Sequence, residues 1–579
     1  MQVELLAHLQ FLYGEERAAE ICERLERIVT RRKVGIDARG AGKTELFSQR
    51  DAILITYGDM VRADGERPLQ TLHEFLSAAV GDSVNTVHLL PFFPYSSDDG
   101  FSVIDYRQVD PALGNWSDIA VLEGTYLLMF DAVVNHVSAQ SDWFKRFLQG
   151  EPPYDEYFIV VDGDAGLEDV FRPRALPLLS EVETANGRKS VWTTFSADQI
   201  DLNFANPDVL LAVIDTLLFY VEKGADLIRL DAIAYIWKEM GSPCIHLPQT
   251  HRIIQLMRSV LDIAAPHVLL ITETNVPHED NVSYFGDGYN EAQMVYNFSL
   301  PPLTLHAFHK GNAETLSAWA KTLELPSQQT SFFNFLASHD GIGLTPARGL
   351  ISDEEVREIA ERVEALGGYV SYRSNPDGSQ SPYELNISYI DALGDPDKEE
   401  PDATVARRFM AAQAIMLALR GVPGIYFHSL FGSRSWHEGV EQSGQKRRIN
   451  RQKLSKGVLQ AELANENSLR HLILPSYLRL LQARRSEPAF HPNGGQNIVD
   501  LDRAVFAIER VSPDGRSSIL CLQNVSSEER QIRLPLGFAT AEDILSGQAM
   551  RSPQLTLQPY QIFWLRQVED GEMIDDELP

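Results

Sequence analysis

Two charged residues stand two positions apart in an otherwise apolar segment, "ADLIRLDAIAYIWKE". The leucine and isoleucine residues around Arg229 and Asp231 are typical of a β-strand that is buried on both faces, where an unpaired charge is costly. The segment ends in residues that could begin a helix. The C-terminal end of such a strand is a usual place for active-site side chains, and the alternative is an ion pair with a purely structural role.

Polar side chains also follow other apolar segments of the chain. They are Asp131, Asn135 and His136 after "TYLLMF", Glu273 after "VLLIT", and His339 and Asp340 after "SFFNFLAS". If these segments are neighbouring parallel strands, the carboxylates of Asp231, Glu273 and Asp340 converge on one rim. A structural role explains one such residue easily. The whole set at the same end of several strands favours an active site.

Three carboxylates in this arrangement suit the cleavage of a glycosidic bond. One carboxylate must be ionised to attack or stabilise an oxocarbenium-like carbon, and another must hold a proton for the leaving oxygen. We expect Arg229 to lower the pKa of Asp231 and so keep it a competent nucleophile. We expect partial burial to raise the pKa of Glu273, as a general acid/base requires.

The elements that must position these residues follow from the hydrophobic pattern. Eight apolar segments predict eight strands, which begin near residues 52, 86, 125, 224, 267, 294, 331 and 421. Amphipathic segments such as "NPDVLLAVIDTLLFYVEKG" lie between most of them and predict helices. This alternation predicts an α/β protein with a (β/α)8 TIM barrel.

Further parts are predicted around the barrel. The predicted divisions are a helical extension (1–50), three barrel parts (51–137, 199–340 and 403–488), an inserted domain B after the third strand (138–198), a second insertion after the seventh strand (341–402), a C-terminal antiparallel β domain (489–570) and an acidic tail (571–579). Both insertions leave the C-terminal ends of strands. We therefore expect both to overhang the active-site face.

The composition bounds the partners and the location of the protein. The net charge of −30 argues against nucleic acid and anionic membranes as partners. The three cysteines, Cys22, Cys244 and Cys521, lack disulfide or zinc spacing and suit a reducing compartment. The first residues do not resemble a signal peptide, and no apolar run approaches the roughly 20 residues of a membrane span. We expect a cytoplasmic protein with no cofactor and no required metal, and a homodimer is compatible with the sequence.

Four segments, "DAVVNH", "LIRLDAIAY", "ITETN" and "FLASHD", resemble the four motifs of the α-amylase clan, glycoside hydrolase family 13, and occur in the family's order. The resemblance covers most of the chain and implies the barrel fold. Carried over position by position, it implies three reacting carboxylates and three sugar-binding side chains. These are Asp231 as nucleophile, Glu273 as general acid/base and Asp340 as transition-state stabiliser, with Arg229, His136 and His339 around the cleaved glucose.

Longer stretches, such as "SSDDGFSVIDYRQVD", "FRPR" and "RRINR", are similar to the sucrose phosphorylase subfamily. This resemblance implies a pocket for a single glucosyl unit and a site for phosphate. The residues implied are Asp99, His136 and Arg451 on the distal hydroxyls, Phe101 as an apolar wall, and Arg174 and Tyr383 on phosphate. Guanidinium and hydroxyl donors hold phosphate well. The predicted enzyme is a hexosyltransferase that forms α-glucose 1-phosphate.

The sequence departs from sucrose phosphorylase near the predicted acceptor site. The differing positions are Phe171, Ser381, Pro382 and Glu384, and arginines occur at Arg348, Arg373 and Arg434. We predict that Glu384 and these arginines belong to the phosphate and acceptor site, because cations gathered in an acidic chain favour an anionic acceptor. The pattern is similar to the branch of phosphorylases whose acceptor is D-glycerate. Sucrose, sucrose 6′-phosphate and glucosylglycerol phosphorylases are the close alternatives.

The predicted reaction is a double displacement that retains the configuration at the anomeric carbon. Asp231 forms a covalent β-glucosyl intermediate, and phosphate then displaces it. A hydrolase or transglucosidase would use water or a sugar in the second step. From a different class, the chain could be an inactive barrel that serves as a binding or scaffold protein, although the presence of all three carboxylates argues against this.

Overall fold

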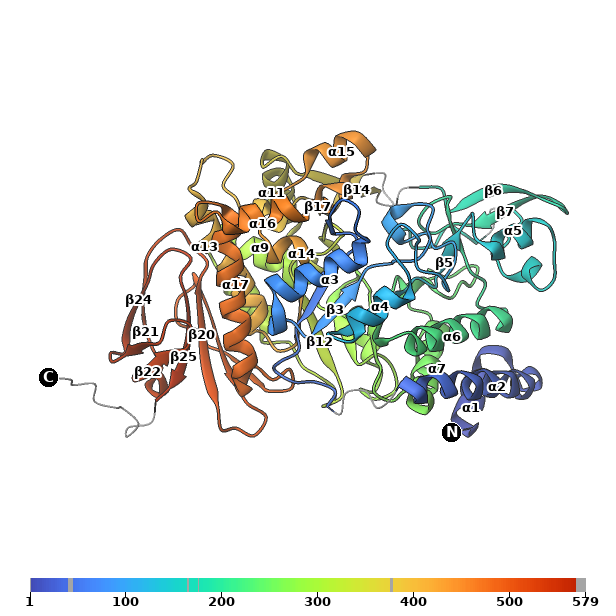
Figure 1. Cartoon of the computed structure of the whole chain (residues 1–579), viewed down its shortest axis with the longest axis horizontal. Helices are drawn as coiled ribbons and strands as arrows, with labels where there is room; N and C mark the ends of the chain where they lie inside the picture. Colours follow the sequence, from blue (N-terminus) through green and yellow to red (C-terminus); the bar gives the residue numbers. More distant parts are fainter. Residues whose placement is uncertain (1, 40–44, 164–165, 175, 375–378, 569–579) are drawn as a thin grey trace.

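A closed barrel of eight parallel strands lies at the centre of the molecule (Figure 1). The computed structural model describes residues 2–39, 45–163, 166–174, 176–374 and 379–568. In order around the barrel, the strands are β1 (Ile53–Thr56), β3 (Thr86–Leu89), β4 (Leu127–Ala132), β9 (Ala225–Leu230), β10 (Leu269–Thr272), β11 (Met294–Tyr296), β12 (Ser331–Phe335) and β16 (Val422–Tyr426). Each strand lies in a predicted apolar segment. The predicted (β/α)8 fold is confirmed.

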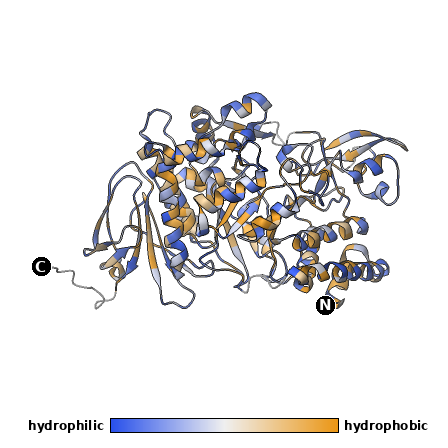
Figure 2. Ribbon diagram, viewed as in Figure 1, coloured by the Kyte–Doolittle hydropathy of each residue, from blue (hydrophilic) through white to orange (hydrophobic). Residues whose placement is uncertain are grey.

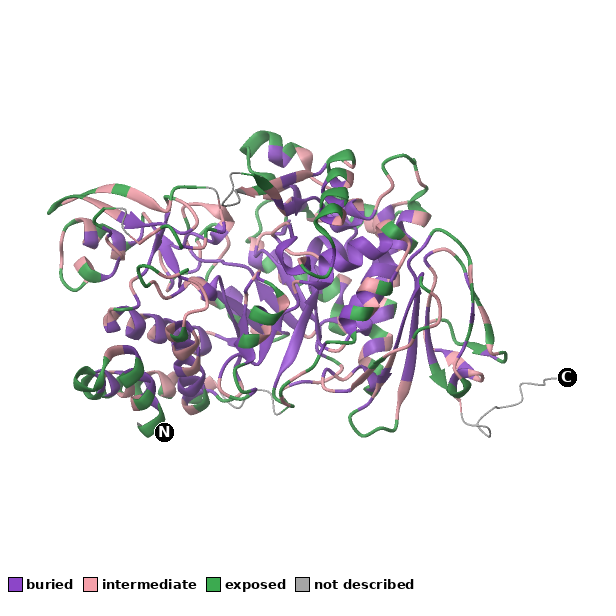
Figure 3. Ribbon diagram, turned by 180° about the vertical axis from the view of Figure 1, so that it is seen from behind, coloured by how far each residue is buried: buried purple, intermediate pink, exposed green. Residues whose placement is uncertain are grey.

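Helices alternate with these strands and surround the barrel. They are α3 (Pro68–Ala79), α4 (Trp116–Glu123), α6 (Pro207–Glu222), α7 (Pro248–Ala264), α8 (His278–Val282), α9 (Leu300–Lys310), α10 (Glu314–Ala320), α13 (Asp402–Ala418), α14 (Phe427–Leu430), α15 (His437–Ser443), α16 (Lys456–Ala464) and α17 (Leu469–Ser486). Apolar residues dominate the central strands, and polar residues mark the outer parts of the molecule (Figure 2). Burial follows the same division (Figure 3), as expected when apolar area is removed from water.

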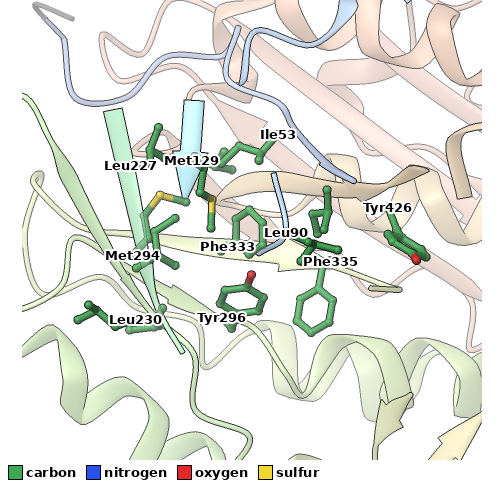
Figure 4. Close-up of a cluster of buried hydrophobic side chains, with 14 of the residues drawn as sticks. Ile53, Leu90, Met129, Leu227, Leu230, Met294, Tyr296, Phe333, Phe335 and Tyr426 are labelled. Atoms are coloured by element: carbon green, nitrogen blue, oxygen red, sulfur yellow. The ribbon is translucent and has the colours of Figure 1, made fainter. Parts of the chain in front are cut away.

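Side chains from several strands fill the interior of the barrel. Figure 4 shows Met129, Leu227, Met294 and Phe333 gathered in one apolar cluster. The Phe333 ring fits because the neighbouring strand β16 has a glycine beside the ring: a Cβ atom on Gly424 would lie 2.3 Å from it. This close-packed layer supports the polar side chains at the C-terminal ends of the strands.

The first insertion follows β4 and is closed at its base by a pair of short strands. β5 (His136–Ser138) pairs with β8 (Gln199–Asp201) in antiparallel register. Within the insertion lie helix α5 (Asp142–Leu148) and the hairpin of β6 (Leu179–Thr184) and β7 (Gly187–Trp192). Since His136 begins β5, the closing strands place a predicted sugar-binding residue at the junction with the barrel.

The second insertion follows β12 and contains a three-stranded sheet. Its strands are β13 (Ile342–Gly343), β14 (Tyr369–Ser374) and β15 (Gln380–Asn386), and its helices are α11 (Asp353–Ala365) and α12 (Tyr389–Ala392). β15 is the central strand, so it contacts the segment that leaves the barrel immediately after Asp340. Residues 375–378 of the predicted loop lie outside the described residues.

The two ends of the chain add separate parts to the barrel. Helices α1 (Gln2–Tyr13) and α2 (Glu15–Arg39) pack beside α6 and α7, where Arg32 pairs with Asp215 at 2.6 Å and with Glu222 at 2.9 Å. The C-terminal strands are β18 (Gly495–Ile498), β19 (Val505–Val511), β20 (Ser518–Asn524), β21 (Arg530–Arg533), β22 (Ala541–Asp543), β23 (Gln548–Met550), β24 (Gln554–Leu557) and β25 (Ile562–Gln567). They form the predicted antiparallel domain. The predicted acidic tail lies outside the described residues.

Two kinds of feature are absent from the described residues. None of their helices combines the length and apolar character of a membrane-spanning segment. Among the same residues, no three or more His, Cys, Asp or Glu side chains are grouped so that they could hold a metal ion.

A buried lysine joins the first insertion to the barrel. The Nζ atom of Lys238 lies 2.5 Å from the carboxylate of Asp201 and 2.8 Å from the side-chain oxygen of Asn135. Asp201 also accepts hydrogen bonds from the Thr194 main-chain N–H and hydroxyl. The lysine charge therefore balances a carboxylate that is wholly removed from water.

Lys238→Ala should lower the free energy of unfolding by about 3–5 kcal/mol, because Asp201 would be left as an uncompensated buried charge. Thermal and urea unfolding measure the effect. Lys398→Ala is the control, since Lys398 pairs with Asp395 at the surface, where a solvent-screened ion pair adds little to stability. Equal losses in the two variants would contradict the buried-pair interpretation.

Candidate active site

The three predicted carboxylates meet in one pocket at the C-terminal ends of the barrel strands. Strands β9 and β10 are parallel neighbours, and Leu230 is in register with Thr272. Asp231 and Glu273, the next residues on the two strands, therefore lie side by side. Asp340 follows β12, and all three carboxylates line the pocket.

Half of the predicted binding residues line the same pocket. Those that do are Phe101, His136, Arg174, His339, Tyr383 and Glu384. Arg229 and Arg451 are buried beside it and contact lining carboxylates directly. The remaining predicted residues, Asp99, Arg348, Arg373 and Arg434, are not among the lining residues.

Arg229 is the centre of a buried ion-pair network. Its Nη1 atom donates to Asp131 and, at 2.7 Å, to Asp231. Its Nη2 atom lies 3.7 Å from Glu273. His88 contacts the second oxygen of Asp131 at 2.7 Å. The charged pair Arg229 and Asp231 thus has partners from the strands on both sides, β4 and β10. One of these partners is Asp131, for which no role was predicted.

The pKa values of the adjacent carboxyls differ in part from the expectation. Burial raises the pKa of Asp231 above its ordinary value and outweighs the opposing effect of Arg229, so the predicted lowering of this pKa is wrong in direction. Burial also raises the pKa of Glu273, to about 7, as predicted. Glu273 accepts one hydrogen bond, from the Ala232 main-chain N–H at 3.0 Å. Because Arg229 donates directly to Asp231 but stays 3.7 Å from Glu273, Asp231 is the better-held anion of this pair.

Asp340 has a different environment from the other two carboxyls. Burial alone would raise its pKa, but the charges of Arg447, His339 and Arg451 together hold it well below the ordinary value. Arg447 donates to Oδ1 at 2.5 Å, and Arg451 donates to the same oxygen at 3.3 Å. Asp340 is therefore a permanent anion at the edge of the pocket.

An aromatic wall and a histidine complete the side of the pocket next to Asp231. The rings of Phe101 and His339 are stacked, with 4.6 Å between their centroids and 2° between their planes. Burial lowers the pKa of His339 to about 3, so its ring is neutral. His136 and Gln199 both contact the Phe101 carbonyl oxygen at 2.9 Å. These contacts fix a flat apolar face beside polar groups, a combination suited to a sugar ring.

The structure places Asp98 rather than Asp99 at the pocket. Asp98 lines it, whereas Asp99 pairs with Arg448 and Arg451, each at 2.8 Å. Both aspartates have left-handed backbone conformations, with φ of 52° and 50°. In this tight turn consecutive side chains take different directions, which the sequence "SSDDGF" does not reveal.

The predicted cationic residues fall into three groups. Arg174 lies on the pocket, 3.4 Å from Asp98 and 5.5 Å from the centre of the Phe195 ring. Arg348 lies near Arg373, outside the pocket lining; burial and then the Arg348 charge lower the pKa of Arg373. Arg434 is half exposed and forms ion pairs with two surface aspartates, at 2.8 and 3.2 Å. The structure does not bring it to the pocket, because those carboxylates hold it elsewhere.

Several lining residues were missed in the sequence. They are Asp98, Gln199, Tyr235, Asn275 and Arg447. Asp98 stands beside the predicted Asp99 in "SSDDGF", and Arg447 stands four residues before the predicted Arg451 in "RRINR". The choice between such residues within a loop has no signal in hydrophobic periodicity. Tyr383 is partly buried, and burial raises its pKa to about 12, so its hydroxyl keeps its proton.

Comparisons with known proteins agree with this geometry. The family model "Alpha amylase, catalytic domain" matches residues 81–355. The chain is 48% identical to glucosylglycerate phosphorylases of Spirochaeta thermophila, over 97% of this chain and 98% of that one, and of Allomeiothermus silvanus, over 98% of both. The crystal structure of sucrose 6F-phosphate phosphorylase from Thermoanaerobacter thermosaccharolyticum superposes with a TM-score of 0.71 at 25% identity, covering 82% of this chain and 94% of that one.

The barrel and its carboxylates define an α-amylase-type enzyme that acts on glycosidic bonds. The chain is 48% identical to two glucosylglycerate phosphorylases over nearly its full length, and it belongs to their family. The resemblance to family 13 and its phosphorylases that was seen in the sequence motifs is confirmed.

Glu273→Gln should make the substrate-free protein more stable than the wild type above pH 7. The wild-type carboxyl keeps its proton up to about pH 7 when folded, but an unfolded chain releases it near its ordinary value of 4.5. Wild-type stability therefore falls as the pH rises between these values, by on the order of 3 kcal/mol. Glutamine has no such proton, so the difference should be small at pH 4 and large at pH 8.

Thermal unfolding midpoints at several pH values test this expectation. Glu361→Gln, on the exposed face of α11, is the control and should follow the wild type at every pH. A Glu273→Gln variant whose advantage did not grow with pH would contradict a raised pKa at this position.

Proposed function

We propose that the protein is a retaining glycoside phosphorylase that converts glucosylglycerate and phosphate reversibly to α-D-glucose 1-phosphate and D-glycerate. The observation that carries the proposal is the pairing, in one pocket, of an arginine-held aspartate with a glutamic acid whose pKa is about 7. The 48% identity to glucosylglycerate phosphorylases supports this choice of substrate.

In the first step, Asp231 attacks the anomeric carbon of the glucosyl group. The bond from that carbon to the glycerate oxygen breaks, and Glu273 transfers its proton to the departing oxygen. A carboxyl with a pKa near 7 is protonated in a large fraction of molecules at neutral pH, which suits a general acid. The glucosyl group is then bound to Asp231 in the β configuration.

In the second step, phosphate takes the place of glycerate. A phosphate oxygen attacks the same carbon, the ester bond to Asp231 breaks, and α-glucose 1-phosphate is formed. Glu273, now ionised, accepts the proton that a monoprotonated phosphate oxygen releases. The reverse sequence builds the glucoside.

The other pocket residues are proposed to hold the glucosyl group and its developing charge. Asp340 is placed to bind ring hydroxyls and stabilise the oxocarbenium-like transition state, because it stays anionic. His136 and the stacked pair of Phe101 and His339 are proposed to line the sugar. Asp98, backed by Arg451 at 3.3 Å, takes the distal position that was first predicted for Asp99.

Arg174 is the best-placed cation for phosphate and for the glycerate carboxylate. Its one ion pair with a described carboxylate is long, at 3.4 Å to Asp98. Arg447, the other arginine of the pocket, is already paired with Asp340 and Glu384. Arg174 and the Tyr383 hydroxyl are therefore proposed to hold the two anions in turn, with loop movement between the two states.

Three further parts of the proposal concern the setting of the reaction. We propose that Arg348 and Arg373 form an outer cationic region that draws anions toward the pocket, in a chain whose net charge is −30. We also propose a cytoplasmic enzyme, in keeping with its three scattered cysteines, that needs no cofactor or metal. A homodimer is compatible with the proposal.

In reverse phosphorolysis, glucose 1-phosphate should be consumed fastest with D-glycerate. Glycerol, fructose and fructose 6-phosphate should each react at least tenfold more slowly, because none presents a carboxylate in the same place. Phosphate release and product mass measure the reaction. Preference for fructose 6-phosphate would favour sucrose 6′-phosphate as substrate, and accumulation of free glucose in the forward direction would favour a hydrolase.

Arg174→Gln should raise the KM for phosphate and the KM for glycerate by roughly 10- to 100-fold, the effect of losing a hydrogen bond between charged groups. The rate of glucose release from α-glucosyl fluoride in water should change less than about threefold, since neither anion takes part. Arg172→Gln is a matched control: Arg172 is in the same loop but donates to a main-chain carbonyl outside the pocket. Equal effects of both substitutions would contradict the proposed anion site.

A further inference from the structure

Glu384 and Arg447 both line the pocket and are paired with each other. The two carboxylate oxygens of Glu384 accept from Arg447, with Nη2 at 2.6 Å and Nε at 3.1 Å. The residue is 4% exposed, so the pair is largely removed from water. The third nitrogen of the same guanidinium, Nη1, donates to Oδ1 of Asp340 at 2.5 Å. Arg447 therefore connects Glu384 to one of the three carboxylates that the reaction uses.

The hydrogen bonds from arginines to Asp340 leave one of its two carboxylate oxygens available to a substrate. Oδ1 accepts from Arg447 and, at 3.3 Å, from Arg451. Oδ2 has a longer contact, 3.5 Å to the neutral ring of His339. The two arginines thus fix the rotation of the carboxylate, and Oδ2 is the oxygen left for the sugar of the proposed reaction.

The two arginines are themselves held from different parts of the fold. Arg451 donates to Asp99 at 2.8 Å and to the His339 carbonyl at 2.8 Å, so it belongs to the barrel and its β3 loop. Arg447 is held by Glu384, which lies on strand β15 of the second insertion. Asp340 is therefore fixed jointly by the barrel and by the insertion.

The backbone is built to bring Glu384 to this position. Strand β13, just after Asp340, pairs with β15, and Gly343 is in register with Glu384. Gly341 lies against the same side chain: a Cβ atom there would be 2.6 Å from Cγ of Glu384 and 2.5 Å from the Leu385 carbonyl oxygen. Any side chain at 341 would displace the glutamate, so glycine is needed for its close approach.

We propose that Glu384 is a positioning residue that acts through Arg447 on Asp340, and that it does not contact the acceptor. A free glutamate facing the acceptor would repel a carboxylate or phosphate. Paired at both oxygens, Glu384 instead neutralises Arg447 and holds it at the distance that Asp340 requires. The proposal rests on the function proposed above, because it assigns Asp340 to glucosyl transfer, and it revises the predicted acceptor role of Glu384.

Turnover of α-glucosyl fluoride in water tests the proposal without any acceptor. In that reaction the bond from the anomeric carbon to fluoride breaks, the bond to Asp231 forms, and water then releases glucose. Glu384→Gln and Arg447→Lys should each lower the rate of fluoride release roughly 10- to 100-fold, as expected when a reacting group loses its fixed orientation. Neither should change the KM for glycerate by more than about twofold.

The double variant Glu384→Gln/Arg447→Lys separates positioning from a general loss of structure. If the two residues act as one unit, its rate should be no lower than that of the slower single variant, whereas independent roles would multiply the losses. Glu361→Gln is the matched control and should behave as the wild type. Thermal midpoints identify any variant that does not fold, and the remaining single variant then carries the test.

The possible results are distinguishable. Unchanged fluoride release with a raised KM for glycerate would overturn the proposal and return Glu384 to the acceptor site. Multiplied losses in the double variant would also overturn it. Failure of the wild type to turn over glucosyl fluoride would instead refute the retaining glucosyl transfer on which the proposal rests.

Discussion

The active site depends on one buried guanidinium. Arg229 is 2% exposed and lies among Asp131, Asp231 and Glu273, three carboxyls that burial makes costly to ionise. Its contacts are unequal: it donates directly to the two aspartates and stays 3.7 Å from the glutamate. This difference in distance separates two neighbouring carboxyls into a held anion and a protonatable acid. A lysine could not do this, because a point charge has no fixed fork of donors.

Opposite charges are closely matched around the rest of the pocket. Four carboxylates (Asp98, Asp99, Asp340 and Glu384) face four arginines (Arg174, Arg447, Arg448 and Arg451). Most of these pairs are short, so most of the cations are already satisfied. The long contact of Arg174 is the exception. Under the proposed function, an anion that reaches the pocket meets Arg174, the one loosely held guanidinium among these four.

The barrel could be predicted because its signal is local. Each buried strand is a short apolar run. Asp231 and Glu273 stand directly after such runs and Asp340 a few residues after one, so their meeting followed from the parallel arrangement. The partners of those carboxylates were harder to predict from the sequence. Arg447 pairs with Asp340 and Glu384 across separations of 107 and 63 residues, and nothing in its own segment indicates this. The net rise of the Asp231 pKa was missed because burial, the larger effect, depends on the whole surrounding fold.

The difference between strand ends and inserted loops also explains how one barrel can serve different acceptors. The carboxylates belong to strand ends, whose geometry is set by close packing inside the barrel and tolerates little change. The cations proposed for the acceptor site belong to the two insertions, where a turn or a single glycine affects which side chain lies at the pocket. A superposition with a TM-score of 0.71 at 25% identity fits this division, since the barrel is shared while most residues differ. The pairing of β13 with β15, just after Asp340, is the point at which the backbone of the second insertion reaches the carboxylates at the strand ends.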